Sequence, residues 1–213
     1  GERLLLVSDI TAFEAAFGTG LPVAGTYSGQ LDNGGENLTL SAADGNEIQS
    51  LRYNDRAPWP LRPDNDGTSL TLIAPGTNPD AGDPANWRSS ILPGGTPGAS
   101  DALPFDGTTA GELLAYILPN PLAGISPSID PIEVNGSTEP YLVANISQYL
   151  AADDAVIEVQ FSPDLKEWQS DSAVFLGSFS QADNTTGKSW RALLPLSDNE
   201  PLRYARLVVS PRD

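Results

Sequence analysis

Cysteine, histidine and methionine are all absent from this 213-residue chain. Without cysteine the protein has no disulfide bond, no thiolate nucleophile and no cysteine-ligated zinc site. Without histidine a Ser-His-Asp triad and an imidazole metal ligand are also excluded. Because cysteine and methionine are the most easily oxidised side chains, their absence suits a protein exported from a bacterial cell. We therefore expect a secreted or cell-surface location.

Positive charge is scarce as well. The chain has 11 basic and 28 acidic residues, which give a formal net charge of -17. Such a surface repels phosphate backbones and anionic membranes, so we expect no nucleic-acid partner. Apolar runs are too short for a membrane span, and no signal peptide is evident. Since residue 1 is a glycine, the sequence is typical of a processed or truncated chain.

Turn-forming residues are abundant, with 20 glycines and 19 prolines, which favours many turns and few long helices. In the first hundred residues one helix is predicted, with a capping box from Thr11 to Glu14 and an end at Gly18. The segment Ala43-Asp44-Gly45-Asn46 is typical of a tight hairpin turn. Strands are predicted at 4–7, 24–29, 37–42, 47–53 and 69–73.

Residues 101–123 are predicted to be a connector with one short helix. Thr109 and Glu112 fit a second capping box, and Pro119 ends the helix. From residue 124 to 213 a strand pattern resumes, with Asn135-Gly136 as a turn and strands predicted at 131–135, 140–147, 155–162, 173–180, 188–194 and 202–209. The predicted fold class is all-β, with two antiparallel β-sandwich domains at 1–100 and 124–213.

Several stretches of the first hundred residues form a recognisable pattern when they are taken together. They are GERLLLVSDITAFEAAFG, YSGQLDNGGENLTLSAADGNEIQSLRYNDRAPWP, GTSLTLIAPGTNPDAGDPANWRSS and GGTPGAS. In this order they resemble the bacterial lamin tail domain, and the pairing of APWP with DPANWR is the most specific part. The resemblance implies an immunoglobulin-like sandwich from an exported multidomain bacterial protein.

The C-terminal half carries a second resemblance, over residues 110–213. The stretches ELLAYILPNP, LAADDAVIEVQFSPDLKEW and PLRYARLVVS resemble a module that ends large secreted proteins of Verrucomicrobia-type bacteria. In such proteins a connector with a helix leads into a terminal β-sandwich. The resemblance therefore implies the same order of parts that the strand pattern predicts.

The lamin-tail resemblance also points to missing strands. Members of that family have several strands before the GERLLLV stretch, and an immunoglobulin-type sandwich needs about seven strands. Only five are predicted in residues 1–100, so the first sandwich is expected to be incomplete. An unpartnered central strand exposes backbone groups and an apolar face. We expect Leu4, Leu5, Leu6 and Val7 to form an assembly edge, completed by an N-terminal remainder of the same protein or by another subunit.

Tryptophan occurs four times, and one of the four is a candidate ligand-binding residue. Trp59 lies between Pro58 and Pro60, which favours an irregular surface segment. An exposed indole there would stack on a sugar ring, whereas the alternative is a ring that pins a loop or fills a core. Trp168 is expected at a corner of the second sandwich core.

One acidic turn is a candidate metal-binding site. Asp64, Asn65 and Asp66 precede Gly67 in a pattern that is typical of a calcium-binding loop, because hard cations need several oxygen ligands from a tight turn. The EF-hand pattern is broken, since Pro75 occupies the twelfth position where a bidentate glutamate is needed. The alternative is a solvated turn in an acidic protein. No other cofactor is expected.

Three functions remain open on this sequence. The first is a non-catalytic structural or interaction module of an exported multidomain protein, which assembles or attaches neighbouring domains or subunits. The second is a carbohydrate-binding accessory domain with a polysaccharide partner. The third is a carboxylate-dependent hydrolase, but the sequence marks no pair of acids for that role. We therefore expect the chain not to be an enzyme.

Overall fold

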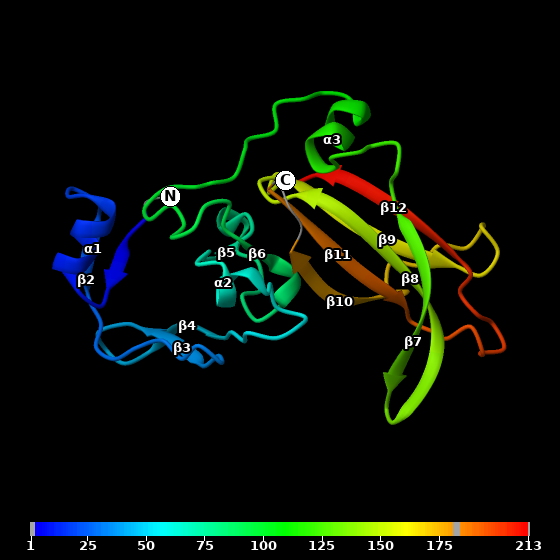
Figure 1. Ribbon diagram of the computed structural model, residues 1–213, viewed down its shortest axis with the longest axis horizontal. Helices are drawn as coiled ribbons and strands as arrows, with labels where there is room; N and C mark the ends of the chain where they lie inside the picture. The colour runs from blue at the N-terminus through cyan, green and yellow to red at the C-terminus, as the bar shows by residue number, and fades with distance from the viewer. Residues whose placement is uncertain (1–2, 181–183, 213) are drawn as a thin grey trace.

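The computed structural model of the protein describes residues 3–180 and 184–212 (Figure 1). Strands dominate these residues and helices are few, so the chain is all-β, as its sequence predicts. The strands of an N-terminal region are β1 (Leu5–Val7), β2 (Val23–Thr26), β3 (Asn37–Ser41), β4 (Glu47–Arg52), β5 (Leu70–Leu72) and β6 (Trp87–Ser89). Those of a C-terminal region are β7 (Ser126–Val134), β8 (Ser137–Tyr149), β9 (Ala155–Ser162), β10 (Ala173–Ser180), β11 (Thr185–Ala192) and β12 (Tyr204–Pro211).

The strands of the N-terminal region pair two by two and form three separate ladders within the described residues. β1 lies parallel to β2, whereas β3–β4 and β5–β6 are antiparallel. The parallel first pair corrects the expectation of antiparallel pairing throughout. A two-stranded ribbon is marginally stable in water, so each ladder depends on contacts outside its own pairing.

The first helix, α1 (Ile10–Phe17), begins two residues earlier than the sequence predicts, because its N-cap is Asp9 and not Thr11. Asp9 is its N-cap, in extended conformation, and accepts a hydrogen bond from the backbone N–H of Ala12. The predicted capping box from Thr11 to Glu14 is therefore wrong, because Thr11 already lies inside the helix. Gly18 ends the helix as predicted, with a φ of 87° that a side chain would strain.

The β3–β4 hairpin has the predicted turn, in which Ala42 donates its backbone N–H to the carbonyl oxygen of Asn46 at 2.8 Å. Its apolar side chains are less buried than a half-covered sheet requires. Leu40 is 50 % exposed and Ile48 is 63 % exposed. Leu38 and Leu51, which face each other across the ladder, are the half-buried pair. This hairpin therefore presents apolar residues to solvent on part of its surface.

In the part of the C-terminal region that the structure describes, the strands form two antiparallel sheets. One has the strand order β10-β11-β8-β7, and the other pairs β12 with β9. β7 and β8 form a long hairpin around Asn135 and Gly136, whose φ angles of 53° and 81° fit a type I′ turn. Figure 1 shows β9 and β12 beside the four-stranded sheet along its length. The strands at 155–162 and 173–180 match their predicted ranges.

A hydrophobic core joins the two sheets. Phe161 of β9, Ile146 of β8 and Ala192 of β11 are almost fully buried in it. The helix α3 (Ala110–Ile117) covers one end of this core with Leu113 and Ile117. Its predicted capping box is confirmed, because Thr109 accepts from the N–H of Glu112 and Glu112 accepts from the N–H of Thr109. The connector helix is thus part of the C-terminal region.

Candidate functional site

The strand β1 is bonded on one side only. Leu5 donates its N–H to the carbonyl oxygen of Pro22 at 2.9 Å, and the carbonyl oxygen of Val7 accepts from the N–H of Tyr27 at 3.0 Å. Because backbone groups alternate along a parallel strand, the N–H and C=O of Leu6 point away from β2. No other strand pairs with β1 among the described residues. The predicted edge at Leu4–Val7 is therefore open on this side.

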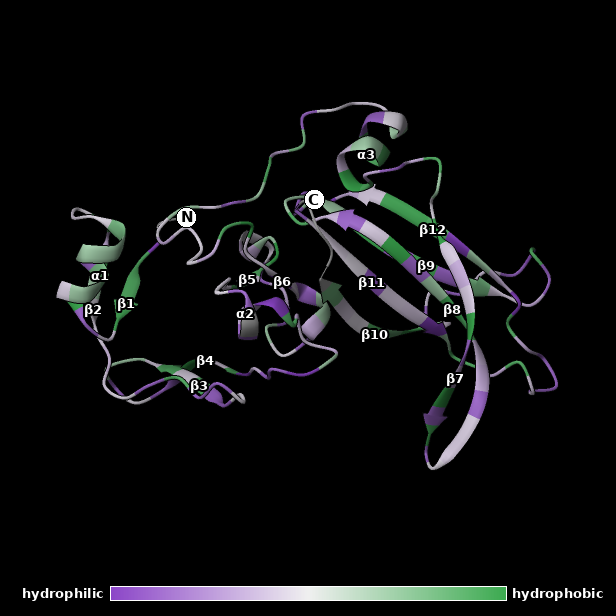
Figure 2. Ribbon diagram, viewed as in Figure 1, coloured by the Kyte–Doolittle hydropathy of each residue, from purple (hydrophilic) through white to green (hydrophobic). Residues whose placement is uncertain are grey.

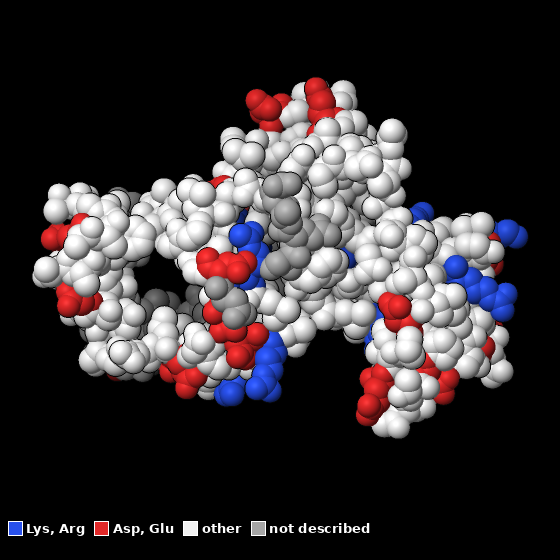
Figure 3. Space-filling view, viewed as in Figure 1, with Lys and Arg blue, Asp and Glu red and all other residues white. Residues whose placement is uncertain are grey.

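Apolar side chains surround this open edge. Leu4 is 70 % exposed and Leu6 is 56 % exposed, whereas Val7 is buried. Figure 2 shows hydrophobic residues on β1 and α1, at the end of the molecule opposite the C-terminal region. The space-filling view shows an opening between this end and the rest of the chain (Figure 3). The apolar residues near β1 are thus left uncovered by the described part of the chain.

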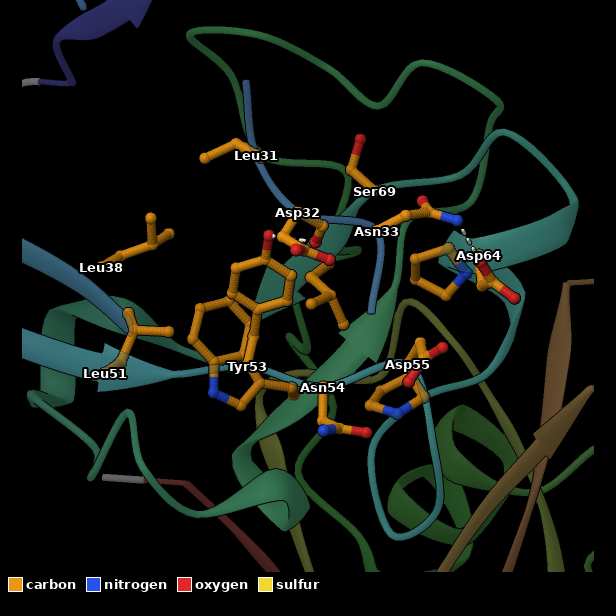
Figure 4. A pocket seen from close by; sticks show the side chains of 14 residues that line it. Leu31, Asp32, Asn33, Leu38, Leu51, Tyr53, Asn54, Asp55, Asp64 and Ser69 are labelled. Atoms are coloured by element: carbon orange, nitrogen blue, oxygen red, sulfur yellow. Dashed lines mark hydrogen bonds between the residues drawn. The ribbon is translucent and has the colours of Figure 1, made fainter. Parts of the chain in front are cut away.

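A pocket of about 430 Å³ lies between the β3–β4 hairpin and the ladder of β5 and β6. Figure 4 shows Leu38 and Leu51 on one side of it, and Asn33 with Asp64 on the opposite side. Apolar and polar side chains both line the pocket: Leu31, Asp32, Asn33, Leu38, Leu51, Tyr53, Asn54, Asp55, Pro60, Pro63, Asp64, Ser69, Leu70 and Trp87. The mixture suits a ligand with an apolar face and hydroxyl groups.

Tyr53 is the best-anchored side chain of this pocket. Its hydroxyl donates to the carbonyl oxygen of Asp32 at 2.6 Å and lies 3.3 Å from Oε1 of Glu36. Burial, together with the charge and hydrogen bond of Glu36, raises the pKa of the Tyr53 phenol. The hydroxyl is therefore protonated at neutral pH and acts as a hydrogen-bond donor.

The three residues of the predicted calcium loop are not gathered around one point. Asp64 accepts from the side-chain amide of Asn33 at 2.9 Å, and Asp66 forms an ion pair with Arg62 at 3.2 Å. The side chain of Asn65 lies outside the described part of the structure. No cluster of three or more acidic residues that could hold a metal occurs among the described residues. A calcium site at this turn stays a prediction.

Trp59 does not present the exposed ring that its flanking prolines suggest. It is 6 % exposed, and its ring lies 5.9 Å from that of Trp87. Trp87 in turn donates its indole N–H to the carbonyl oxygen of Ala81. Trp168 also differs from expectation, because it lies half-buried in the loop after β9, under the guanidinium of Arg206 at 4.6 Å. None of the four indoles forms an exposed platform.

The N-terminal and C-terminal regions meet at a buried ion pair that sequence reasoning missed. Arg88 of β6 donates from Nε to Oδ1 of Asp153 at 2.6 Å and from Nη2 to Oδ2 at 2.8 Å. It also pairs with Asp101 of the connector, and both side chains are almost fully buried. Burial opposes the charge of Arg88, but hydrogen bonds to Asp153 and Asp101 outweigh it and raise the pKa of Arg88.

The carboxylate of Asp101 has two hydrogen-bond donors. Its carboxylate binds Arg88 and accepts from the backbone N–H of Ile91 at 2.9 Å. Burial would raise the pKa of Asp101, but the hydrogen bonds from Arg88 and Ile91 lower it below the usual value. These three charged residues lie 13 and 65 positions apart in sequence, and only the fold brings them together.

Comparisons of the chain with protein-family models, with curated proteins and with solved structures found no match. Over the residues that the structure describes, it supports an all-β chain with one hydrophobic core in the C-terminal region and three two-stranded ladders in the N-terminal region. The lamin-tail resemblance stays an interpretation of residues 1–100. Among the described residues, no helix has both the length and the apolar character that a membrane crossing requires.

Proposed function

We propose that the chain is a non-catalytic structural and interaction module of an exported bacterial protein, and that it binds an extended polypeptide segment along β1. The observation that carries this proposal is the pairing of the N-terminal strands into three separate ladders. An open edge with unpaired backbone groups is the surface that strand addition uses. The segment belongs either to another part of the same protein or to another subunit.

The accessible surface supports a covered N-terminal region. The chain of 22.4 kDa exposes 12438 Å², against roughly 9,400 Å² for a compact monomer of this mass. The surplus of roughly 3,000 Å² exceeds the surface that a standard protein interface buries in total. The apolar residues near β1 and on the β3–β4 hairpin contribute to it. A partner that covers them removes a surface that a lone chain keeps exposed.

Amide hydrogen exchange at Leu6 tests the proposal at single-residue resolution. In the chain alone at low concentration, the amide of Leu6 should exchange quickly, while that of Leu5, which is bonded to Pro22, exchanges more slowly. Protection of Leu6 at high concentration identifies a second copy as the partner. Protection only in the full gene product identifies another part of the same protein. An unprotected Leu6 amide in both samples contradicts the proposal.

A matched pair of variants checks that β1 is the binding edge. Leu6→Lys places a charge on the open strand and should abolish any concentration-dependent assembly seen by sedimentation velocity. Leu122→Lys adds the same charge at a residue that is 98 % exposed in the connector, and assembly should be unchanged. Equal effects of the two variants would show that charge alone, and not the edge, controls association.

A second function is favoured by one observation, the pocket beneath the β3–β4 hairpin. We propose polysaccharide binding there as the alternative role. Its polar residues include the carboxamides of Asn33 and Asn54 and the hydroxyl of Tyr53, which match the hydrogen-bonding needs of sugar hydroxyls. A glycan array tests this, and Asn54→Ala should remove any binding found. Binding that survives this variant would place the ligand elsewhere.

A further inference from the structure

A smaller pocket lies where the N-terminal region meets one end of the C-terminal core. Its volume is about 180 Å³. Ile73, Ala85 and Asn86 line it from the N-terminal region, and residues of β8, β9, β10 and β11 line it from the C-terminal region. This space equals about six water molecules, so it suits a ligand of only a few heavy atoms.

Lys188 of β11 points into this pocket from the inner face of the sheet. Because side chains alternate along a strand, Lys188 shares its face with Trp190 and Ala192, which pack on the core. It is only 8 % exposed, and its ammonium group makes no hydrogen bond or ion pair with the residues that the structure describes. An ammonium at the end of so buried a side chain is poorly hydrated, so an anionic or hydrogen-bonding group that faces it stabilises it.

Gln148 of β8 brings a second unsatisfied group to the same pocket. It is 6 % exposed, and its side-chain oxygen Oε1 has no hydrogen-bond partner. A buried acceptor without a donor carries a desolvation penalty. The pocket therefore offers a donor at Lys188 and an acceptor at Gln148, so a ligand that carries both kinds of group satisfies both side chains.

The charges that line the pocket favour an anion. Arg212 donates from Nε to the carbonyl oxygen of Asp153 at 2.8 Å and from Nη2 to that of Ala155 at 3.1 Å, so neutral oxygens hold its guanidinium. The Asp153 carboxylate also lines the pocket, but it is bound to Arg88 by two hydrogen bonds. Arg88 is shared between Asp153 and Asp101, so Arg88, Lys188 and Arg212 together exceed these two carboxylates by one positive charge, in a chain whose net charge is -17.

The ionisation of Lys188 agrees with this local surplus. Burial lowers the pKa of Lys188 to about 8; attraction to Asp153 raises it, and repulsion from Arg212 and Arg88 lowers it. The side chain is mostly protonated at neutral pH. A bound anion would favour the charged form and raise this pKa, so anion binding and protonation of Lys188 support each other.

We propose that this pocket binds a small hydroxycarboxylate. The carboxylate group lies between Lys188 and Arg212, and the hydroxyl donates to Oε1 of Gln148. The apolar wall at Ile73 and Ala155 contacts the short carbon skeleton. The pocket is separate from β1 and from the pocket beneath the β3–β4 hairpin, so this binding does not depend on the function proposed above.

A nuclear magnetic resonance titration tests the ligand class. Lactate, acetate and chloride are added separately at matched ionic strength, and the side-chain amide of Gln148 and the backbone amide of Lys188 are followed. Lactate should give saturable shifts at both positions, and acetate, which lacks the hydroxyl, should bind about threefold to tenfold more weakly. Equal saturation by chloride, or no saturable shift with lactate, overturns the proposal.

Variants assign the two recognition groups. Lys188→Met keeps the length of the side chain, removes the buried charge and should weaken lactate binding by about tenfold or more. The matched control is Lys166→Gln, at the other lysine of the chain, which is exposed and should leave binding unchanged. Gln148→Leu should remove the preference for lactate over acetate. A thermal melt of each variant confirms that it is folded.

A pH series on the wild-type chain adds a readout of Lys188 itself. Its pKa is lowered to about 8, so the group is charged below this pH and neutral above it. Lactate binding should therefore weaken as the pH rises through and above 8, and Lys188→Met should show no such loss. Binding that is independent of pH between 6 and 10 contradicts the role given to Lys188.

Discussion

The N-terminal and C-terminal regions have similar strand numbers but very different burial. In the C-terminal region, alternate residues of β8, β9 and β11 enter one core, and Phe161 is fully buried. In the N-terminal region, three ladders remain apart, and Leu6 and Leu40 stay at least half exposed. Strand pairing alone therefore does not make a core. Two sheets must face each other before their apolar sides leave water.

Truncation of a core residue should give the largest effect and the clearest contrast between the regions. Phe161→Ala removes a fully buried ring from β9 and should lower the free energy of unfolding by about 3–5 kcal/mol. Leu40→Ala, at a half-exposed residue of the N-terminal hairpin, should change it by less than about 0.5 kcal/mol. Urea unfolding measures both. Similar losses would mean that the N-terminal region has a core of its own.

Removal of the buried arginine between the regions should have the next largest effect. Arg88→Met leaves the carboxylates of Asp101 and Asp153 unpaired and should cost about 3 kcal/mol. Calorimetry should then show a separate, earlier transition for the N-terminal region. The triple variant, with Asp101→Asn and Asp153→Asn added, serves as the control and should recover much of the loss. No recovery would mean that the arginine acts through packing alone.

The same ion pair predicts a response to acid. Burial raises the pKa of Asp101, but the hydrogen bonds from Arg88 and Ile91 outweigh this, so the pKa in the folded chain lies below its unfolded value. Its contribution to stability is therefore complete above the unfolded pKa of about 3.9 and is lost as the pH falls through the folded pKa. Melting temperatures between pH 5 and pH 2 should fall more steeply for the wild type than for Arg88→Met.

Removal of a helix cap should give the smallest effect. It tests whether α3 unfolds together with the C-terminal region. Thr109→Ala removes the hydroxyl that accepts from the N–H of Glu112 and should cost about 1 kcal/mol. The control Thr108→Ala keeps the backbone N–H that Glu112 binds and should be nearly neutral. Since α3 packs on the C-terminal core, the loss should appear in the transition of that region. A change only in the N-terminal transition would contradict this assignment.

Local patterns were enough to predict most of the strands. Residues 155–162 alternate apolar and polar side chains and are bounded by turns, and the predicted range is the observed one. β6 was missed because Trp87, Arg88 and Ser89 are too few to show a period. The first helix was misplaced because Asp9 and Thr11 are both good N-caps, and the choice between them depends on backbone geometry.

The candidate sites were harder to predict, because they depend on contacts between distant residues. The prolines beside Trp59 predict an exposed ring. They do not indicate that the ring of Trp87 packs against the ring of Trp59 in the fold. The pairing of Arg88 with Asp153 spans 65 positions and has no local signal. The position of Lys188, in contrast, follows from the local sequence. Its spacing of two and four residues from Trp190 and Ala192 already places it on the inner face of a strand.

The ion pair at Arg88 also joins two points of the chain that lie 65 positions apart, which has a consequence for a chain under tension. Tension applied to the N-terminal region would reach Asp153 through Arg88, in parallel with the other contacts between the regions, such as those at Ile73 and Asn86. The connector is fixed again where Leu103 donates to the carbonyl oxygen of Ala151. When the ion pair opens, the intervening segment of roughly 14 residues can lengthen to at most about 50 Å. We therefore expect the connector to act as a tether that limits how far the two regions separate once these contacts open.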